Sequence, residues 1–241
     1  MLHVDEHVVV VDKPAGVLSA RARGEPSVPV LLRRQGAIGP KEPLGVVHRL
    51  DRETSGVMVL ARTRDAQRHV SQQFFNRTVE KVYLALVTGH VGEDEGEIDR
   101  MLRVHKSGTR VEVVSRKGKR CLTRYRVLER LTGNTLLECR PLTGRMHQIR
   151  AHLSAIGHPL TVDPLYGGGE AVLLSAYKPG YRPSARHDER PLIERLTLHA
   201  QRLSFDHPDG SGRVTFEADL PKEFRATLYQ LRRLGVGRGR G

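Results

Sequence analysis

The chain has 241 residues, which is long enough to bury a sizeable core as one large domain or two small ones. Its net charge of +13 favours a polyanionic partner such as nucleic acid, although an Arg-rich compositional bias would give the same sign. The two cysteines, Cys121 and Cys139, stand apart, which excludes a Cys-x-x-Cys zinc or redox motif and argues against a disulfide framework. No stretch approaches the ~18 apolar residues of a membrane span, so we expect a cytoplasmic protein without membrane contact.

The N-terminal part predicts two strands and a short helix. Residues 7–12 predict a strand that ends at Lys13, and a Gly- and Pro-rich loop over 20–45 contains a short predicted helix at 28–34. The run Val57–Ala61 is apolar at every position, which is typical of a strand buried on both faces.

The middle of the chain predicts a helix and three further strands. Apolar side chains recur every four positions in residues 64–76, which predicts a helix with Asp65 as a candidate cap. Residues 79–88 alternate as a strand, and residues 121–140 predict a strand pair that turns at 132–134.

The C-terminal part mixes helices, strands and loop. Residues 144–156 predict a helix capped by Thr143 and stopped by Gly157, and residues 167–193 predict an irregular insertion. Two strands and a final helix follow at residues 194–205, 213–219 and 222–234.

Strands outnumber helices, and many neighbouring strands look like hairpins. We therefore expect an α+β fold, with a mixed and mostly antiparallel sheet flanked by helices and loops, in one domain of residues 1–234. Residues 235–241 alternate Gly with Arg or Val and have little to bury, which predicts a disordered basic tail.

The segment His48–Gly56 holds the best candidate for chemistry. Charged and turn-forming residues stand directly before the buried strand Val57–Ala61, so the carboxylate of Asp51 is held at the end of a rigid element. By itself, Asp51 could equally satisfy backbone donors in a turn.

Six further segments stand in a fixed order around it: Lys13–Gly16, Lys81–Gly89, Thr143–Leu153, Gly157–Pro159, Asp163–Gly167 and Leu198–Ala200. Together with His48-Arg49-Leu50-Asp51, they resemble the RluA family of pseudouridine synthases, in which the Asp of this tetrapeptide is catalytic. The resemblance runs from about residue 8 to Leu220 and is more specific than any one short motif. An S4 RNA-binding module, which some members carry, has no room before residue 8, so we expect the catalytic domain alone.

The resemblance implies a pseudouridine synthase fold and the isomerisation of uridine to pseudouridine in structured ribosomal or transfer RNA. The N-glycosidic bond breaks, the uracil turns, and its C5 bonds to the ribose C1′. No redox change occurs and no water is consumed, so we expect no cofactor and no metal. RNA is the expected partner of a monomeric enzyme.

The resemblance also assigns roles to single residues. Asp51 attacks covalently or takes a proton from the sugar, and both roles stay open. Arg145, of the Thr-Gly-Arg motif, keeps Asp51 charged, and Tyr83 lies against the target uracil. Arg49 fills the space that the flipped uridine leaves. Leu198 packs against the base or is an ordinary core leucine, and both readings stay open.

Other charged and titratable groups have weaker patterns. His147 and His152 are five positions apart and share no helical face, so with His48 and His199 they predict hydrogen-bonding histidines rather than a metal site. The irregular insertion offers cations for an RNA path, or a solvated loop: Lys178, Arg182, Arg186 and Arg190.

Two rival functions stay open. The chain could be a non-catalytic RNA-binding or ribosome-assembly factor, or an unrelated basic hydrolase that uses Asp51 with His48 or His147. Pseudouridylation leaves the mass of RNA unchanged, cleavage does not, and binding alone changes no nucleoside.

Overall fold

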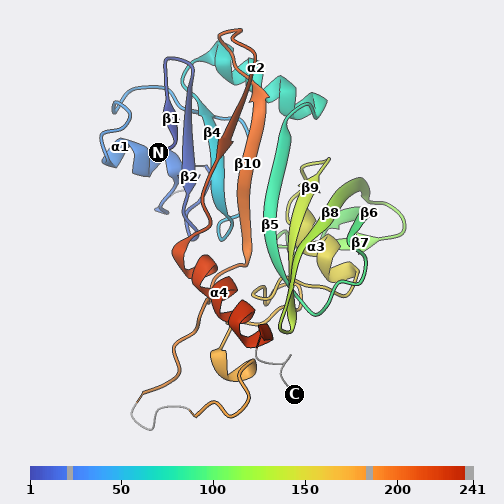
Figure 1. Cartoon of the computed structure of the whole chain (residues 1–241). Helices are drawn as coiled ribbons and strands as arrows, with labels where there is room; N and C mark the ends of the chain where they lie inside the picture. The colour runs from blue at the N-terminus through green and yellow to red at the C-terminus, as the bar shows by residue number, and fades with distance from the viewer. Residues whose placement is uncertain (21–23, 183–186, 237–241) are drawn as a thin grey trace. The chain divides into compact units, whose positions relative to one another are not determined.

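The computed structural model describes residues 1–20, 24–182 and 187–236, and they form two compact units (Figure 1). The first unit comprises Met1–Tyr83 and His199–Asp219; the second comprises Leu84–Leu198 and the segment from Leu220 onward. The chain leaves the first unit within strand β5 (Glu80–Thr88) and re-enters it at the start of strand β10 (Leu198–Asp206).

The first unit is built on a buried sheet around β4. Strand β4 pairs antiparallel with β2 and parallel with β10, and all seven of its residues are buried. Three shorter strands extend this sheet, since β1 pairs with β2, β3 with β4 and β11 with β10. The bounds of these strands are β1 His3–Val4, β2 Val8–Lys13, β3 Gly45–Val46, β4 Ser55–Ala61 and β11 Arg213–Glu217.

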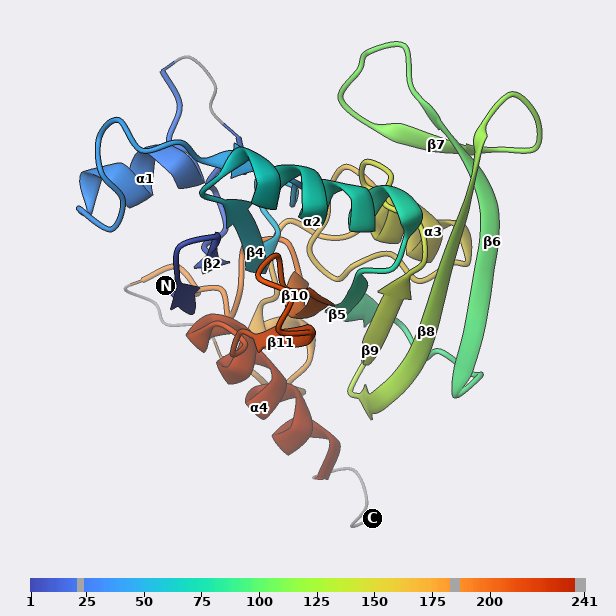
Figure 2. The same ribbon diagram turned by 90° about the horizontal axis from the view of Figure 1, so that it is seen from above.

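Both faces of this sheet are covered, which is why β4 is apolar at successive positions. Val57 and Val59 pack on one side with Val70 of helix α2 (Arg64–Asn76). Met58 and Leu60 pack on the other side with side chains of helix α1 (Val28–Arg34). Helix α2 crosses the end of the sheet at which β4 finishes (Figure 2).

Both helices of the first unit have the predicted bounds, but the cap of α2 is a different residue. The hydroxyl of Thr63 accepts a hydrogen bond from the N–H of Ala66 at 3.1 Å. The prediction of Asp65 as the cap is wrong, because Asp65 lies one residue inside the helix. In the first turn, the Asp65 carboxylate still stabilises the helix by a favourable interaction with the positive end of its dipole.

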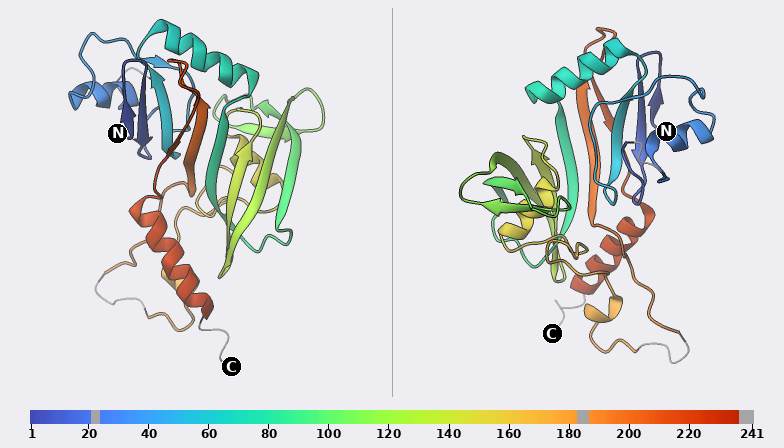
Figure 3. Two further views of the ribbon diagram at one scale, coloured as in Figure 1. Left: turned by 45° about the horizontal axis from the view of Figure 1, so that its top comes forward. Right: turned by 180° about the vertical axis from the view of Figure 1, so that it is seen from behind.

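The second unit contains strands in the order β5-β9-β8-β6-β7, and the long strands run side by side in Figure 3. The pairs β9–β8, β8–β6 and β6–β7 are antiparallel. The predicted pair of strands is β8 and β9, and they turn at Thr132-Gly133. Strands β6 and β7 were not predicted, because charged residues interrupt their apolar positions. The bounds are β6 Glu95–Val104, β7 Val111–Val114, β8 Lys119–Leu131 and β9 Asn134–Pro141.

The helices of the second unit correct two predicted boundaries. Helix α3 covers Gln148–Ala155 and begins four residues later than predicted, and its N-cap is His147 rather than Thr143. Helix α4 covers Lys222–Val236, so the predicted disordered tail begins inside a helix, while residues 237–241 lie outside the described residues.

The predicted irregular insertion over 167–193 contains a single described turn of 3-10 helix, η1 (Leu174–Ala176). The parallel pairing of β4 with β10, among antiparallel pairs, makes the sheet mixed, and the predicted α+β class is confirmed. No helix in the described part of the chain is long and apolar enough to cross a membrane.

Candidate active site

Asp51 lies in a short loop that leads into β4 and is anchored by its neighbours. The side chain of Leu50 is buried in the core, and its backbone exchanges two hydrogen bonds with the hydroxyl of Ser19, at 2.6 and 2.9 Å. The N–H of Thr54 donates to the carbonyl of Asp51 at 3.1 Å. The half-buried carboxylate of Asp51 is therefore carried on a backbone fixed on both sides.

The buried side chain of Lys13 also anchors the loop that carries Asp51. Its side chain is fully buried, and its ammonium donates to the carbonyls of Pro14, Val17 and Arg52 at 2.8–2.9 Å. The N–H of Gly16, a residue with φ +82°, also donates to the backbone carbonyl of Arg52 at 2.9 Å. Burying a charge is unfavourable unless it is hydrogen-bonded, so these carbonyls are what allow Lys13 to tie the two loops together.

The start of β4 is held against β10 at very close range. A Cβ added at Gly56, where φ is +116°, would lie 2.1 Å from the carbonyl oxygen of Ala200. Beside it, Ser55 Oγ and His199 Nδ1 are 2.8 Å apart, and His199 Nε2 lies 3.1 Å from the carbonyl of Ala218. His199 thus links β10 to the start of β4 and to the residue that follows β11.

Tyr83 lies near Asp51 in the first unit. It packs against the core cluster that contains Leu50 and Met58. Burial raises the pKa of the Tyr83 phenol, and the negative charge of Asp51 raises it further. The phenol therefore stays protonated and can donate a hydrogen bond beside the carboxylate.

His48 is occupied by structural contacts. Its ring stacks on Phe74 with centroids 4.6 Å apart, and its Nε2 accepts the N–H of Val59 at 3.1 Å. Burial, together with the positive charge of Lys81, lowers the pKa of His48 to about 3. A neutral ring whose Nε2 already accepts a backbone N–H does not suit the base that the rival hydrolase needs.

Arg145 stands on an ordered loop in the second unit. Its N–H donates to Gln148 Oε1 at 3.1 Å, and the Thr143 hydroxyl donates to the same oxygen at 2.7 Å. The buried Gln148 Nε2 in turn donates to Leu122 and Thr123, both at 3.0 Å. This amide fixes the backbone of Arg145 while its side chain stays exposed.

The remaining predicted residues are distributed over both units. Arg49 is exposed in the first unit, next to Asp51 in sequence, whereas Leu198 is buried at the start of β10. Of the predicted RNA-path cations, Lys178, Arg182 and Arg190 are exposed, and Arg186 lies outside the described residues.

Sequence reasoning missed the two groups that position the site. Lys13 and Gln148 were each matched only as part of a motif segment, with no role of their own. No local pattern marked Gln148, because the partners that its buried amide needs, Leu122 and Thr123, are more than twenty positions away in sequence.

Residues 7–155 match the RNA pseudouridylate synthase family, a range that includes Asp51, Tyr83 and Arg145. The chain belongs to this family. The resemblance drawn from the motifs is therefore confirmed at the level of the family.

Bacterial relatives agree with this assignment. Two proteins called ribosomal large subunit pseudouridine synthase D, from Nitrosomonas europaea and Xylella fastidiosa, are each 38% identical. The alignments cover 97% and 96% of this chain, and 65% and 69% of the relatives. The uncharacterized RNA pseudouridine synthase YlyB of Bacillus subtilis is 35% identical, over 96% of this chain and 72% of its own. The chain thus spans about two thirds of the length of these relatives.

Solved structures show the same fold. Human RNA Pseudouridylate Synthase Domain Containing 1 and Domain Containing 4 both align with a TM-score of 0.70 and 27% identity. The alignments cover 91% and 96% of this chain, and 82% and 92% of the human chains. The predicted pseudouridine synthase fold is confirmed.

Proposed function

We propose that this chain isomerises specific uridines to pseudouridine in structured RNA. The observation that carries the proposal is the Asp51 carboxylate, held on a fixed loop at the start of β4 near Tyr83, in a chain of the RNA pseudouridylate synthase family. Ribosomal RNA is the favoured substrate, because relatives at 38% identity are named for the large ribosomal subunit; transfer RNA is the alternative.

Asp51 would carry out the central step. As a carboxylate it would attack the ribose C1′ or take a proton from the sugar, so that the glycosidic bond breaks and C5 can bond to C1′. Arg145 would keep this carboxylate charged, as the family resemblance implies.

Tyr83 and Arg49 would handle the base. Tyr83, protonated and aromatic, would stack against the uracil and offer a hydroxyl for the movement of the C5 proton. Arg49 would fill the gap left by the extruded nucleotide, and its exposure supports this role. Leu198 would pack against the base.

We further propose that residues 1–234 act as one catalytic domain that works as a monomer in the cytoplasm, where ribosomal and transfer RNA are met. The net charge of +13 supports an RNA partner. The exposed cations Lys178, Arg182 and Arg190, with Arg186, would line part of the RNA path.

The decisive experiment compares Asp51→Asn with the unchanged chain. Asn keeps the size and the backbone contacts of Asp51 but removes the negative charge, so pseudouridine formation in large-subunit ribosomal RNA should fall below detection. Asp65→Asn, which removes an exposed carboxylate from α2, is the matched control and should keep full activity. Mapping pseudouridines by sequencing, with circular dichroism to check folding, gives the readout.

The same assay separates the rival functions. A well-folded Asp51→Asn protein that still makes pseudouridine would sink the assignment of Asp51. An unchanged chain that binds RNA but modifies no nucleoside would be a binding factor. Shortened RNA fragments, with a change in mass, would identify a hydrolase.

A further inference from the structure

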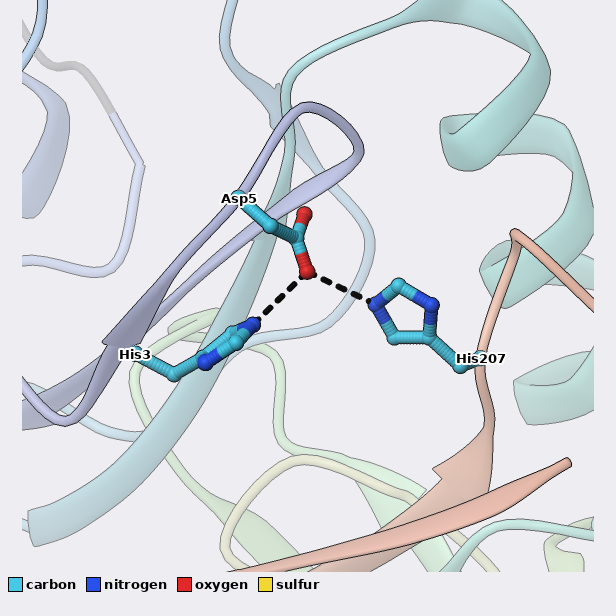
Figure 4. A group of neighbouring side chains, drawn as sticks. All are labelled: His3, Asp5 and His207. Atoms are coloured by element: carbon cyan, nitrogen blue, oxygen red, sulfur yellow. Dashed lines mark hydrogen bonds and ion pairs between the residues drawn. The ribbon is translucent and has the colours of Figure 1, made fainter. Parts of the chain in front are cut away.

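Two histidines and an aspartate meet in the first unit at a place that catalysis does not use. His3 comes from β1, Asp5 from the turn before β2, and His207 from the turn after β10 (Figure 4). Asp5 Oδ2 lies 2.7 Å from His3 Nε2 and 2.9 Å from His207 Nε2. The three potential ligand atoms all lie within 4.8 Å of one another.

The carboxylate of Asp5 is oriented before any ligand arrives. Its Oδ1 accepts the backbone N–H groups of His7 and Val8, both at 2.7 Å. That leaves Oδ2 directed at the two imidazole rings, as Figure 4 shows. Carboxylates that bind metals are commonly fixed in this way by a second set of hydrogen bonds.

His207 has the arrangement of a metal-binding histidine. Its Nδ1 lies 2.7 Å from Asp209 Oδ1, and the backbone N–H of Asp209 donates to the same Nδ1 at 3.4 Å. In the tautomer that carries an N–H on Nδ1, directed at the Asp209 carboxylate, Nε2 presents its lone pair to a cation. The residue is only 5% exposed, and its buried Nε2 has no hydrogen-bond partner, although Asp5 Oδ2 lies close by. A histidine ligand typically donates its second N–H to a carboxylate, and Asp209 places a carboxylate beside His207 Nδ1.

We propose that His3, Asp5 and His207 bind a divalent transition-metal ion, with zinc the best match. Two imidazole nitrogens and one carboxylate oxygen form a ligand set that zinc accepts, with water completing a tetrahedral site. A cation between the three atoms would satisfy the buried Nε2 of His207 and the negative charge of Asp5 together.

The strand registers assign this metal a structural role. Val8 pairs with Ala61, the last residue of β4, whereas Asp51 precedes the first residue of that strand. Strand β10 runs parallel to β4, so His207, which follows β10, belongs to the same far end. The ion would fasten the β1–β2 hairpin to the turn between β10 and β11, away from the catalytic loop.

The alternative is an ion pair without metal, in which a doubly protonated His207 stands between the carboxylates of Asp5 and Asp209. The two arrangements differ in what they bind, because only the first has a cation. Asp209 also separates them. If a metal binds, the loss of Asp209 weakens metal binding less than the loss of a ligand does, because Asp209 contacts His207 and not the ion.

Calorimetric titration of the EDTA-treated full chain with zinc chloride tests the proposal. We expect one strong site, weakened at least ~100-fold in His3→Gln and in Asp5→Asn, and by roughly 10–100-fold in Asp209→Asn. His69→Gln, which changes an exposed histidine of α2, is the matched control and should bind zinc like the unchanged chain. Saturating zinc should also raise the melting temperature of the unchanged chain by roughly 5–10 °C at a hundredfold excess over Kd, and not that of His3→Gln.

Two results would overturn the proposal. If the unchanged chain takes up no zinc at micromolar concentrations, the cluster is an ion pair only. If His3→Gln and Asp5→Asn bind zinc as the unchanged chain does, the metal sits on other histidines. Because His3 is partly exposed, we expect His3→Gln to fold, and circular dichroism checks this.

Discussion

Lys13 and Ser19 fix the backbone on either side of Asp51. The Lys13 ammonium holds the carbonyl of Arg52, and the Ser19 hydroxyl holds the carbonyl of Leu50. Neither side chain is among the residues proposed to touch the uridine, yet both fix the backbone that carries the carboxylate. Small displacements of a reacting group reduce rates strongly, so these hydrogen bonds should matter for turnover as well as for folding.

Lys13→Met tests this positioning role, because Met keeps the length of the side chain and removes the three donors. Three backbone carbonyls would no longer receive the ammonium, so we expect the free energy of unfolding to fall by roughly 3 kcal/mol. The kcat for pseudouridine formation should fall further than RNA affinity does. Lys41→Met, at an exposed lysine, is the control for loss of charge. Urea unfolding and single-turnover kinetics measure both effects; unchanged values for Lys13→Met would deny the lysine a positioning role.

Arg49 offers a second test at the scale of the residue, because its role depends on the state of the substrate. Unstacking a uridine in a folded stem-loop costs a few kcal/mol, and much less in a flexible strand. A difference of 1.36 kcal/mol is about tenfold in rate. Arg49→Ala should therefore reduce the rate of pseudouridine formation in the stem-loop by at least ~10-fold more than in an unstructured fragment of the same sequence. Equal rate ratios for the two substrates would mean that Arg49 only supports Asp51 by its charge.

At the scale of elements, the pattern of the sequence predicted best where one kind of residue dominates. The continuous apolar run in β4 and the four-residue spacing in α2 placed both elements, because β4 is buried at every residue and the buried residues of α2 recur at helical spacing. Strands β6 and β7 were not predicted, because charged side chains at their exposed positions obscure the alternation of apolar and polar residues. The start of α3 was misplaced because the Thr143 hydroxyl donates to the Gln148 side chain and accepts the N–H of Leu122 in β8, rather than an N–H of the first helical turn.

In the candidate site too, only residues that a local sequence pattern marks could be predicted. Asp51 and Tyr83 could be found from motifs, because their own residue types carry the chemistry. The function of Lys13 could not, since one of its acceptors, Arg52, is 39 positions away in sequence. The cluster of His3, Asp5 and His207 was missed for this reason too: its ligands come from both ends of the chain, with no local spacing to recognise.

Gly56 gives the prediction for the packing of one element on another. Gly56→Ala would force a methyl group to within 2.1 Å of the Ala200 carbonyl, at a φ of +116° that other residues rarely adopt. We expect a loss of about 3 kcal/mol or more in unfolding free energy. Gly92→Ala, where an added Cβ meets nothing within 4 Å, should change it by no more than about 0.5 kcal/mol. Thermal or urea unfolding of both variants decides, and similar small changes would show that β4 and β10 can move apart.

At the scale of the whole molecule, charge should govern RNA binding. A net charge of +13 implies that binding releases counterions, so affinity should fall steeply as salt rises. Reversing Lys178, Arg182, Arg186 and Arg190 to Glu should weaken binding and flatten the plot of log affinity against log salt, by ~0.7 for each single-strand phosphate that is no longer neutralised. Fluorescence anisotropy over a salt series measures the slope.

A control with the same change in charge makes the result specific. Arg64, Arg68, Arg116 and Lys117 are exposed in other segments, and their reversal to Glu should leave a steeper slope than reversal of the insertion. If the control flattens the slope and the insertion variant does not, RNA follows a different face of the molecule.

The pairing of β4 with β10 also sets an order of events during synthesis. Ser55 and His199, which share a hydrogen bond, are 144 positions apart. At ~5–20 residues per second, a ribosome needs roughly 7–30 s to make the intervening chain. During that time β4 waits with the edge that β10 will cover still open, a state that invites aggregation. The loop that carries Asp51 can form its hydrogen bonds with Lys13 and Ser19 earlier, but the start of β4 beside it still lacks its partner strand. A nascent chain that stops before β10 therefore has an incomplete candidate site.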